Sequence, residues 1–473
     1  MMNSPISRHS AYHLTSDPWI ILFIILQCGV IAFSAFFPWF VLLAVIGVIL
    51  FGYSLKFPVL GLVILILLHA LILKQSKGIS IQEIIYGSYF VLFYSFWLFQ
   101  RIIIKGERLI HSSRELWLLS FIGLCFFSLT TALIVQGKVI QWFRELIPFL
   151  TLLLYFPLVD VMKNRRNAVI LLISFFALAV IIGVQNIFGY RENLRAAVYF
   201  WEIASGRQVA NEAIFFSGIV VLMGMFFHTS SYAVRIFLAG LLIFFGLTLV
   251  VTFSRGYWIG TVLGIMVIFF LLDLSKKIRF LVSFAVFIIA SLSIFYMLFG
   301  SITPYLEKSI LQRASTLSAL QSDISLMNRL SEAKSLIGYI VRSPIIGYGL
   351  GAAFSYFNVI HFITVKTFYS HNAYLYLWFK LGIFGVISFL GFYCANLKTC
   401  WKFDKMTEHE FEQGIMMALV AILVAMIPLS ITSPQFIQKD SLLVITLITS
   451  YITVMERDYL EKSLTLKSLS ETP

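Results

Sequence analysis

The sequence predicts an all-α membrane protein that crosses the bilayer about 12 to 14 times, with one long extracytoplasmic loop that contains short helices. Of the 473 residues, 60% are hydrophobic and only 12% are charged, whereas soluble domains average about 25% charged residues. Apolar runs such as Ala168 to Phe188 and Ala233 to Phe253 reach the length of about 20 residues that a membrane-spanning helix needs. Short polar breaks separate many such runs, so the chain is expected to form a polytopic helix bundle.

The apolar runs give candidate spans that begin near residues 19, 38, 57, 84, 116, 146, 168, 212, 233, 257, 279, 372, 414 and 441. They predict a cytoplasmic amino terminus (1–18), transmembrane helices (19–299), an extracytoplasmic loop (300–370), further transmembrane helices (371–456) and a cytoplasmic tail (457–473). This orientation places most Lys and Arg residues of the short connections inside, as the positive-inside rule requires. The net charge of +13 has the same explanation, so we expect a multi-pass protein of the cytoplasmic (inner) membrane with no nucleic-acid partner.

The loop from residue 300 to 370 is too long to lack structure of its own. Leu330, Leu336 and Ile340 belong to a set of apolar residues that recur at helical spacing, and Pro344 ends the run. We expect a helix there that lies against the membrane surface. The glycines of Gly347-Tyr348-Gly349-Leu350-Gly351 then permit a tight backbone path towards the last helices.

Three arginines are candidate anion ligands near the predicted outer face. Arg255 lies in a short break between two apolar helices, Arg207 lies just ahead of another helix, and Arg329 begins the periodic loop helix. A guanidinium is always charged, and its planar fork of donors fits phosphate oxygens. The alternative is a side chain that snorkels to the headgroups for Arg255, and an ordinary solvated charge for Arg207 and Arg329.

His371 is the histidine whose position favours chemistry. It precedes the predicted helix that runs through Gly382 and Gly385, which Ser370 is expected to cap. A neutral imidazole at this helix start can accept the proton of an attacking hydroxyl, although a lone interfacial histidine is usually unremarkable. Lys380 is a charge inside an apolar run, for which a functional or packing role is the default hypothesis and snorkelling the alternative.

Common phosphate and metal motifs are missing from the sequence. It contains no Gly-x-x-x-x-Gly-Lys phosphate loop, no Cys pair with zinc spacing and no Asp-x-Asp pair. We therefore expect no metal and no cofactor, and we expect arginines to meet any phosphate. A phosphate-bearing substrate at the outer leaflet would be linked to a lipid.

Three segments on the predicted outer face follow one another in the sequence. They are Phe253-Ser254-Arg255-Gly256-Tyr257-Trp258-Ile259-Gly260, then Arg329 followed by Ser343-Pro344-Ile345-Ile346-Gly347-Tyr348-Gly349-Leu350-Gly351, then Ser370-His371-Asn372-Ala373-Tyr374 with Leu381-Gly382-Ile383-Phe384-Gly385. In order and spacing they resemble the successive signatures of the O-antigen ligase and polymerase family. The resemblance covers roughly residues 200 to 390.

This resemblance implies a metal-independent membrane glycosyltransferase of the type C class. Such an enzyme moves a glycan from undecaprenyl diphosphate to an acceptor hydroxyl during assembly of a surface polysaccharide of the cell envelope. It implies a diphosphate-binding role for Arg207 and Arg255, with Arg329 in the same cationic cluster, and a catalytic role for His371 as the base. The implied partners are the lipid-linked donor, a glycan or lipid-linked acceptor, membrane lipids and other polysaccharide-assembly proteins. Lys380 stands where the family often has Glu.

Two alternatives stay open at this point. A ligase and a polymerase differ in the acceptor, whereas the three segments describe mainly the donor end. A flippase for lipid-linked oligosaccharides, or another polysaccharide transporter, would also combine many helices with an internal cationic site. Transporters usually contain paired halves with interrupted helices at matching positions, and the sequence has no such internal symmetry, which favours an enzyme.

Overall fold

The structure is a computed structural model that describes residues 38–72, 80–135, 139–196, 211–300, 308, 324–404 and 410–470. The predicted amino terminus (1–18), the span expected from residue 19 and Arg207 lie outside the described residues. The chain divides into two compact units, Met1–Gly61 and Leu62–Pro473. Of the first unit the structure describes α2 (Pro38–Lys56) and the beginning of α3 (Pro58–Ile72).

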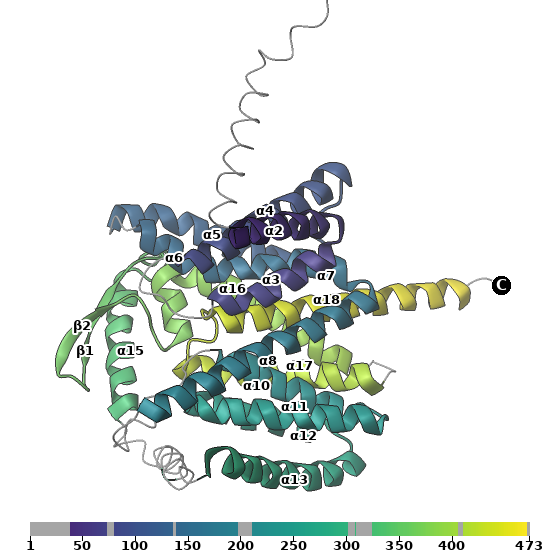
Figure 1. Cartoon of the computed structure of the whole chain (residues 1–473). Helices are drawn as coiled ribbons and strands as arrows, with labels where there is room; N and C mark the ends of the chain where they lie inside the picture. Colours follow the sequence, from purple (N-terminus) through teal and green to yellow (C-terminus); the bar gives the residue numbers. More distant parts are fainter. Residues whose placement is uncertain are drawn as a thin grey trace, which may run out of the picture. The chain divides into compact units, whose positions relative to one another are not determined.

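The described part of the second unit is built mainly of helices (Figure 1). Each span predicted from residue 38 onward coincides with a helix, and the all-α fold class is confirmed. After α3 the helices are α4 (Ile81–Phe99) with a π-helical turn (Gln100–Ile104), α5 (Ser113–Val135), α6 (Val139–Leu150), a 3₁₀ turn (Thr151–Leu154), α7 (Tyr155–Met162), α8 (Arg165–Ala196), α10 (Glu212–His228), α11 (Tyr232–Val251), α12 (Arg255–Leu271), α13 (Leu274–Phe299), α15 (Ile324–Arg342), α16 (Ala373–Asp404), α17 (Glu410–Thr432) and α18 (Lys439–Ser470).

Seven of the described helical segments are long and apolar enough to cross a membrane, which makes this a multi-pass membrane protein. Four further apolar helices have 10–17 residues, among them α10 and α12. The predicted total of about 12 to 14 spans remains a prediction. The seven segments are Ile81–Ile104, Ser113–Ile134, Val139–Met162, Arg165–Arg195, Tyr232–Val251, Ala373–Lys402 and Glu410–Thr432.

The core of the second unit lies where α10, α12 and α17 pack together. Gly224 on α10 faces Gly414 on α17, and a Cβ atom on either residue would collide with the carbonyl oxygen of the other. Small residues of this kind let two membrane helices approach closely, which increases the dispersion contacts between them. α16 packs against α5 and α17, and α18 packs against α7.

α16 is broken near its beginning, where Gly382 has φ +67. The segment that follows Pro344 fills this break: the amides of Tyr348 and Gly349 donate to the carbonyls of Phe379 and Lys380, each at 2.8 Å. The predicted tight path of this segment is confirmed, since the φ angles of its three glycines lie between +73 and +82. A Cβ on Gly351 would lie 2.6 Å from a backbone nitrogen of α6, so only glycine fits there.

The loop between α13 and α16 contains α15 and a β-hairpin that the sequence did not predict. β1 (Phe354–Asn358) pairs antiparallel with β2 (Ile363–Thr367), and the hairpin and α15 lie at one end of the bundle (Figure 1). Ser331 and Ser335 of α15 donate hydrogen bonds to carbonyls of β1 at 2.7 and 2.6 Å. α15 is the helix expected from the periodic run. Its residues Leu330, Ile337 and Val341 are exposed, as a membrane-facing stripe would be.

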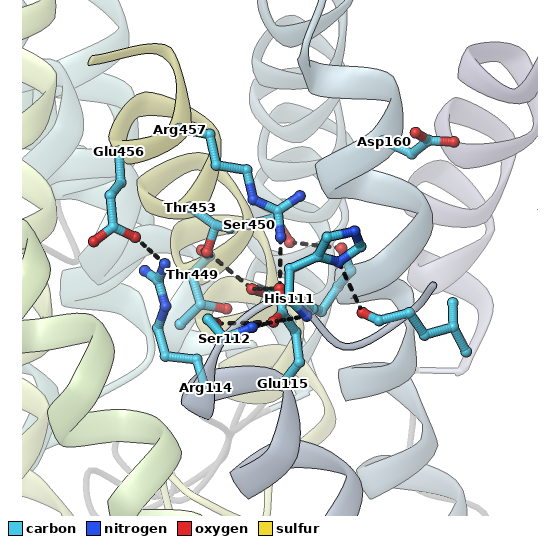
Figure 2. Close-up of polar contacts among 12 residues, drawn as sticks. His111, Ser112, Arg114, Glu115, Asp160, Thr449, Ser450, Thr453, Glu456 and Arg457 are labelled. Atoms are coloured by element: carbon cyan, nitrogen blue, oxygen red, sulfur yellow. Dashed lines mark hydrogen bonds and ion pairs between the residues drawn. The ribbon is translucent and has the colours of Figure 1, made fainter. Parts of the chain in front are cut away.

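A polar cluster at the opposite end of the bundle joins α5 to α18 (Figure 2). The buried carboxylate of Glu115 accepts hydrogen bonds from Arg457 at 2.6 Å, from the hydroxyl of Ser112 at 2.8 Å and from backbone amides that precede α5. Arg114 forms a second ion pair with Glu456. Buried carboxylates are stable only when donors surround them in this way, so the cluster stabilises the position of α18.

Candidate functional site

His371 pairs with a buried carboxylate of the loop helix. Its ring nitrogen Nδ1 lies 2.8 Å from Oε2 of Glu332, and its backbone amide donates to Oε1 of the same residue at 2.8 Å. The Glu332 side chain is 3% exposed, whereas that of His371 is 39% exposed. A carboxylate bound to Nδ1 fixes the ring orientation and favours the tautomer whose Nε2 carries a lone pair. Among the described residues, no hydrogen bond occupies Nε2.

Local capping brings His371 to the start of α16. The Asn372 side chain accepts a hydrogen bond from the amide of Leu375 at 2.9 Å, which is the geometry of a helix N-cap. The expectation that Ser370 caps this helix is wrong, because α16 begins at Ala373 and Asn372 is the residue directly before it. The Ser370 hydroxyl instead accepts from the Asn372 amide at 3.1 Å. This turn positions His371 next to the N-terminus of α16.

Glu332 is the site residue that sequence reasoning missed. The buried face of α15 consists of Asn328, Glu332, Leu336 and Ile340, a strict spacing of four residues. The apolar periodicity therefore continues onto two polar side chains, and that is the signal that could have identified Glu332. Both side chains have partners, since Asn328 accepts from the Val359 amide at 3.1 Å.

A glutamine links the start of α12 to the segment that contains His371. The Tyr257 hydroxyl donates to the side chain of Gln438 at 2.9 Å, and the Gln438 side chain also lies near the Tyr369 hydroxyl. The ring of Tyr369 packs edge-on against that of His371, with centroids 5.4 Å apart. Arg255 lies two residues before Tyr257, so these contacts bring its helix start to the end of the bundle where His371 lies.

The backbone before Arg255 is held in a rare conformation. Phe253 has φ +51 and is 1% exposed, and its ring packs against Tyr190 and Trp258. A positive φ is uncommon for a bulky residue and persists only where the surrounding contacts enforce it. This turn ends α11 and starts α12 at Arg255, which is half-buried.

Carboxylates dominate the described surroundings of the site. Glu212 and Asp440 are each 4% exposed, and both act electrostatically on Tyr257 and on Tyr369. Asp440 also accepts the Ala213 amide at 3.1 Å. An anionic substrate at this end would need compensating cations.

The structure describes two of the three arginines that were predicted to bind an anion. Arg329 is half-buried on α15, one turn before Glu332 and thus near it on the helix surface. Arg255 begins α12, as described above. Arg207 lies outside the described residues, so its role stays a prediction.

Lys380 has a packing role. It is 0% exposed, and its ammonium group donates to Glu145 of α6 and to the carbonyl of Ala352, both at 2.6 Å. The same carboxylate accepts from the Gly351 amide at 2.8 Å and from the Tyr376 hydroxyl at 3.0 Å. This network fixes the segment Gly347–Gly351, called the glycine segment below, between α6 and α16. Lys380 therefore does not snorkel.

The cluster around Glu115 is a weaker candidate for a substrate site. The cavity beside it measures about 10 Å³, which is room for about one water molecule, and its ionised groups pair with one another. Within the ranges that the structure describes, no three His, Cys, Asp or Glu side chains gather as metal ligands do. Metal independence remains a prediction.

Comparison with known proteins relates the part of the chain around His371 to a family. No curated protein matches the chain. A family model described as O-antigen ligase matches residues 238–390, about a third of the chain. The matched region contains Arg255, Arg329, Glu332 and His371, begins after Arg207, and confirms the family resemblance of the three segments. The chain therefore carries a domain of the O-antigen ligase family, which acts in surface polysaccharide assembly as a glycosyltransferase of the ligase or polymerase type.

Proposed function

We propose that the protein transfers a glycan from undecaprenyl diphosphate to an acceptor hydroxyl on the outer face of the cytoplasmic membrane. The observation that carries this proposal is the pair formed by His371 and Glu332. It presents an oriented imidazole, partly exposed, at the end of the bundle where α12 begins at Arg255. A general base of this kind typically contributes about 10² to 10⁴ in rate.

In the proposed reaction His371 is the catalytic base and Glu332 is a positioning residue. Nε2 of His371 takes the proton of the acceptor hydroxyl as its oxygen bonds to the anomeric carbon. The bond between that carbon and the diphosphate oxygen breaks, and its electron pair leaves with undecaprenyl diphosphate. Glu332 stabilises the imidazolium that forms. One direct displacement inverts the configuration at the anomeric carbon.

The arginines would act on the leaving group. Charge grows on the diphosphate oxygen as the anomeric bond breaks, and fixed cations stabilise that charge more in the transition state than in the ground state. Arg255 and Arg329 are candidates within the family domain, and Arg207 is the third. Three buried carboxylates near His371 make such cations a requirement, because an uncompensated diphosphate would be repelled.

A histidine pair in the same loop tests the proposal. His371→Ala should abolish surface polymer in a strain that lacks the chromosomal copy, with unchanged protein levels. His361→Ala, an exposed histidine in the hairpin turn, should restore full polymer. Full polymer with His371→Ala would refute the assignment of the base.

Two further measurements separate the alternatives. Purified protein incubated with an undecaprenyl-diphosphate-linked glycan and an acceptor should release a glycosidic product, which a flippase or other transporter would not form. Mass analysis of the deletion strain distinguishes the acceptors: single unpolymerised units indicate a polymerase, and full-length chains left on the carrier indicate a ligase.

A further inference from the structure

A groove of about 1020 Å³ runs along α8, α17 and α18. It reaches the upper limit of the roughly 300–1,000 Å³ that small-molecule sites occupy. Most of its lining is apolar, including Leu172, Leu419 and Ile448. Val169 in its wall is 45% exposed, so the groove opens towards the surroundings of the bundle.

Charged residues line one end of the groove only. That end is formed by the turn before α8, the start of α17 and the last described side chains of α18. His371 lies at the start of α16, near the end of α17 and the start of α18, so the charged end faces the opposite membrane surface. The charged residues are Lys163, Arg165, Glu412, Asp458, Glu461 and Lys462.

The length of the groove matches one leaflet. On the α18 wall Val444 and Asp458 lie 14 positions apart, which is about 21 Å at about 1.5 Å per residue. On the α17 wall Phe411 and Ile422 lie 11 positions apart, or about 17 Å. One leaflet of hydrocarbon is about 15 Å thick. The apolar part thus has the depth of an acyl chain whose headgroup lies at the charged end.

The charge at the groove mouth selects the kind of headgroup. Lipid tails are as apolar as leucine, so the tails do not favour one lipid over another. Any preference among lipids must therefore come from the headgroup. Among the residues that the structure describes, three cations and three carboxylates line this mouth, so their charges balance, and Lys163 also lies 3.3 Å from Asp160. Arg165 lies 3.0 Å from the partly buried Glu412, and Lys462 lies 3.5 Å from Asp458. Both cations are exposed, and ion pairs with exposed partners contribute little to stability. A headgroup with one phosphate and one ammonium can pair with both signs.

We propose that this groove binds one zwitterionic glycerophospholipid, in the leaflet opposite to His371. The phosphate pairs with Lys163 and Arg165, the ammonium pairs with Asp458 and Glu461, and the acyl chains lie along α17 and α18. The site is separate from the proposed transfer reaction and does not depend on it.

Native mass spectrometry of the detergent-purified full chain tests the site. The protein is titrated with phosphatidylethanolamine or phosphatidylglycerol that carry identical acyl chains. We expect about fivefold more bound phosphatidylethanolamine, because one added contact with a charged residue is worth about that factor. Equal binding, preference for phosphatidylglycerol or retention of a polyprenyl phosphate instead would overturn the proposal.

Two variants locate the bound lipid. Ala168→Trp fills the groove and should remove the phosphatidylethanolamine adduct. Ile173→Trp, exposed on the same helix and outside the groove lining, should keep it. Equal adducts in both tryptophan variants would refute the location.

A double substitution at the mouth keeps the test valid if Ala168→Trp fails to fold. Asp458→Lys with Glu461→Lys alters exposed side chains only and removes the partners of the ammonium. This variant should prefer phosphatidylglycerol. An unchanged preference for phosphatidylethanolamine would refute the role of the headgroup.

Discussion

Replacing Lys380 with methionine tests the buried ion pair that holds the glycine segment. Removal of one partner of a buried pair costs about 3–5 kcal/mol, because the remaining charge loses its compensation. In Lys380→Met the Glu145 carboxylate keeps three donors: the Gly351 amide at 2.8 Å, the Tyr376 hydroxyl at 3.0 Å and the Gln141 side-chain amide at 3.2 Å. Hydrogen bonds to a charged group contribute about 1.5–3 kcal/mol each. We therefore expect a loss near the lower limit, about 3 kcal/mol.

Denaturation of the purified protein in mixed micelles measures this loss as a change in the free energy of unfolding. Lys398→Met is the matched control, since Lys398 is exposed on the same helix and its replacement should change stability by less than about 0.5 kcal/mol. Glu145→Gln should cost about 4 kcal/mol, because it leaves the ammonium of Lys380 buried without an anionic partner.

The double variant provides the decisive comparison. Lys380→Met with Glu145→Gln leaves no buried charge at this position, so its loss should fall short of the sum of the single losses by about 2–3 kcal/mol. Losses that add to within about 0.5 kcal/mol would refute the pairing of Lys380 with Glu145.

Four further predictions concern the site and its supports. Glu332→Gln should lower the turnover of purified enzyme about 100-fold or more, because the His371 tautomer is no longer fixed, whereas Lys334→Gln on the exposed face of α15 should have no effect. Gly351→Ala should lower the free energy of unfolding by about 1–3 kcal/mol through its clash with α6, and Gly338→Ala, which has open space, should not. Glu115→Gln should cost about 3–5 kcal/mol in the same denaturation assay, since Arg457 loses its buried counter-charge. A chelator should leave turnover unchanged, and loss of turnover that added metal restores would contradict metal independence.

Helix positions could be predicted because the bilayer imposes them. In the bilayer an apolar run can satisfy its backbone hydrogen bonds by forming a helix. Each apolar run from residue 38 onward is a helix. The glycine segment was also predictable, because closely spaced glycines next to a proline indicate a path that other residues cannot follow. His371 could be singled out from its place at the predicted outer start of a helix, and the family match contains it, but its catalytic role stays a prediction.

The partners of the key residues could not be predicted from sequence. Glu332 lies 39 residues before His371, and Glu145 lies 235 residues before Lys380. Local periodicity reports only which residues share a face of one element, so a pair that forms when two distant elements dock leaves no local pattern. The hairpin was missed for a related reason, since β2 (Ile363–Thr367) is mostly exposed and alternation is clear only for a half-buried strand.

The position of the proposed base depends on the docking of the loop, because His371 and Glu332 come from different elements. α16 supplies His371 and α15 supplies Glu332, and between them runs the segment that fills the break at Gly382. Lys380 lies two residues before that break and binds Glu145 together with the Ala352 carbonyl. The buried pair therefore fixes the segment that orients α15 relative to α16. Since the imidazole is oriented only while α15 stays docked, loss of the pair should lower turnover as well as stability, although Lys380 touches neither His371 nor Glu332.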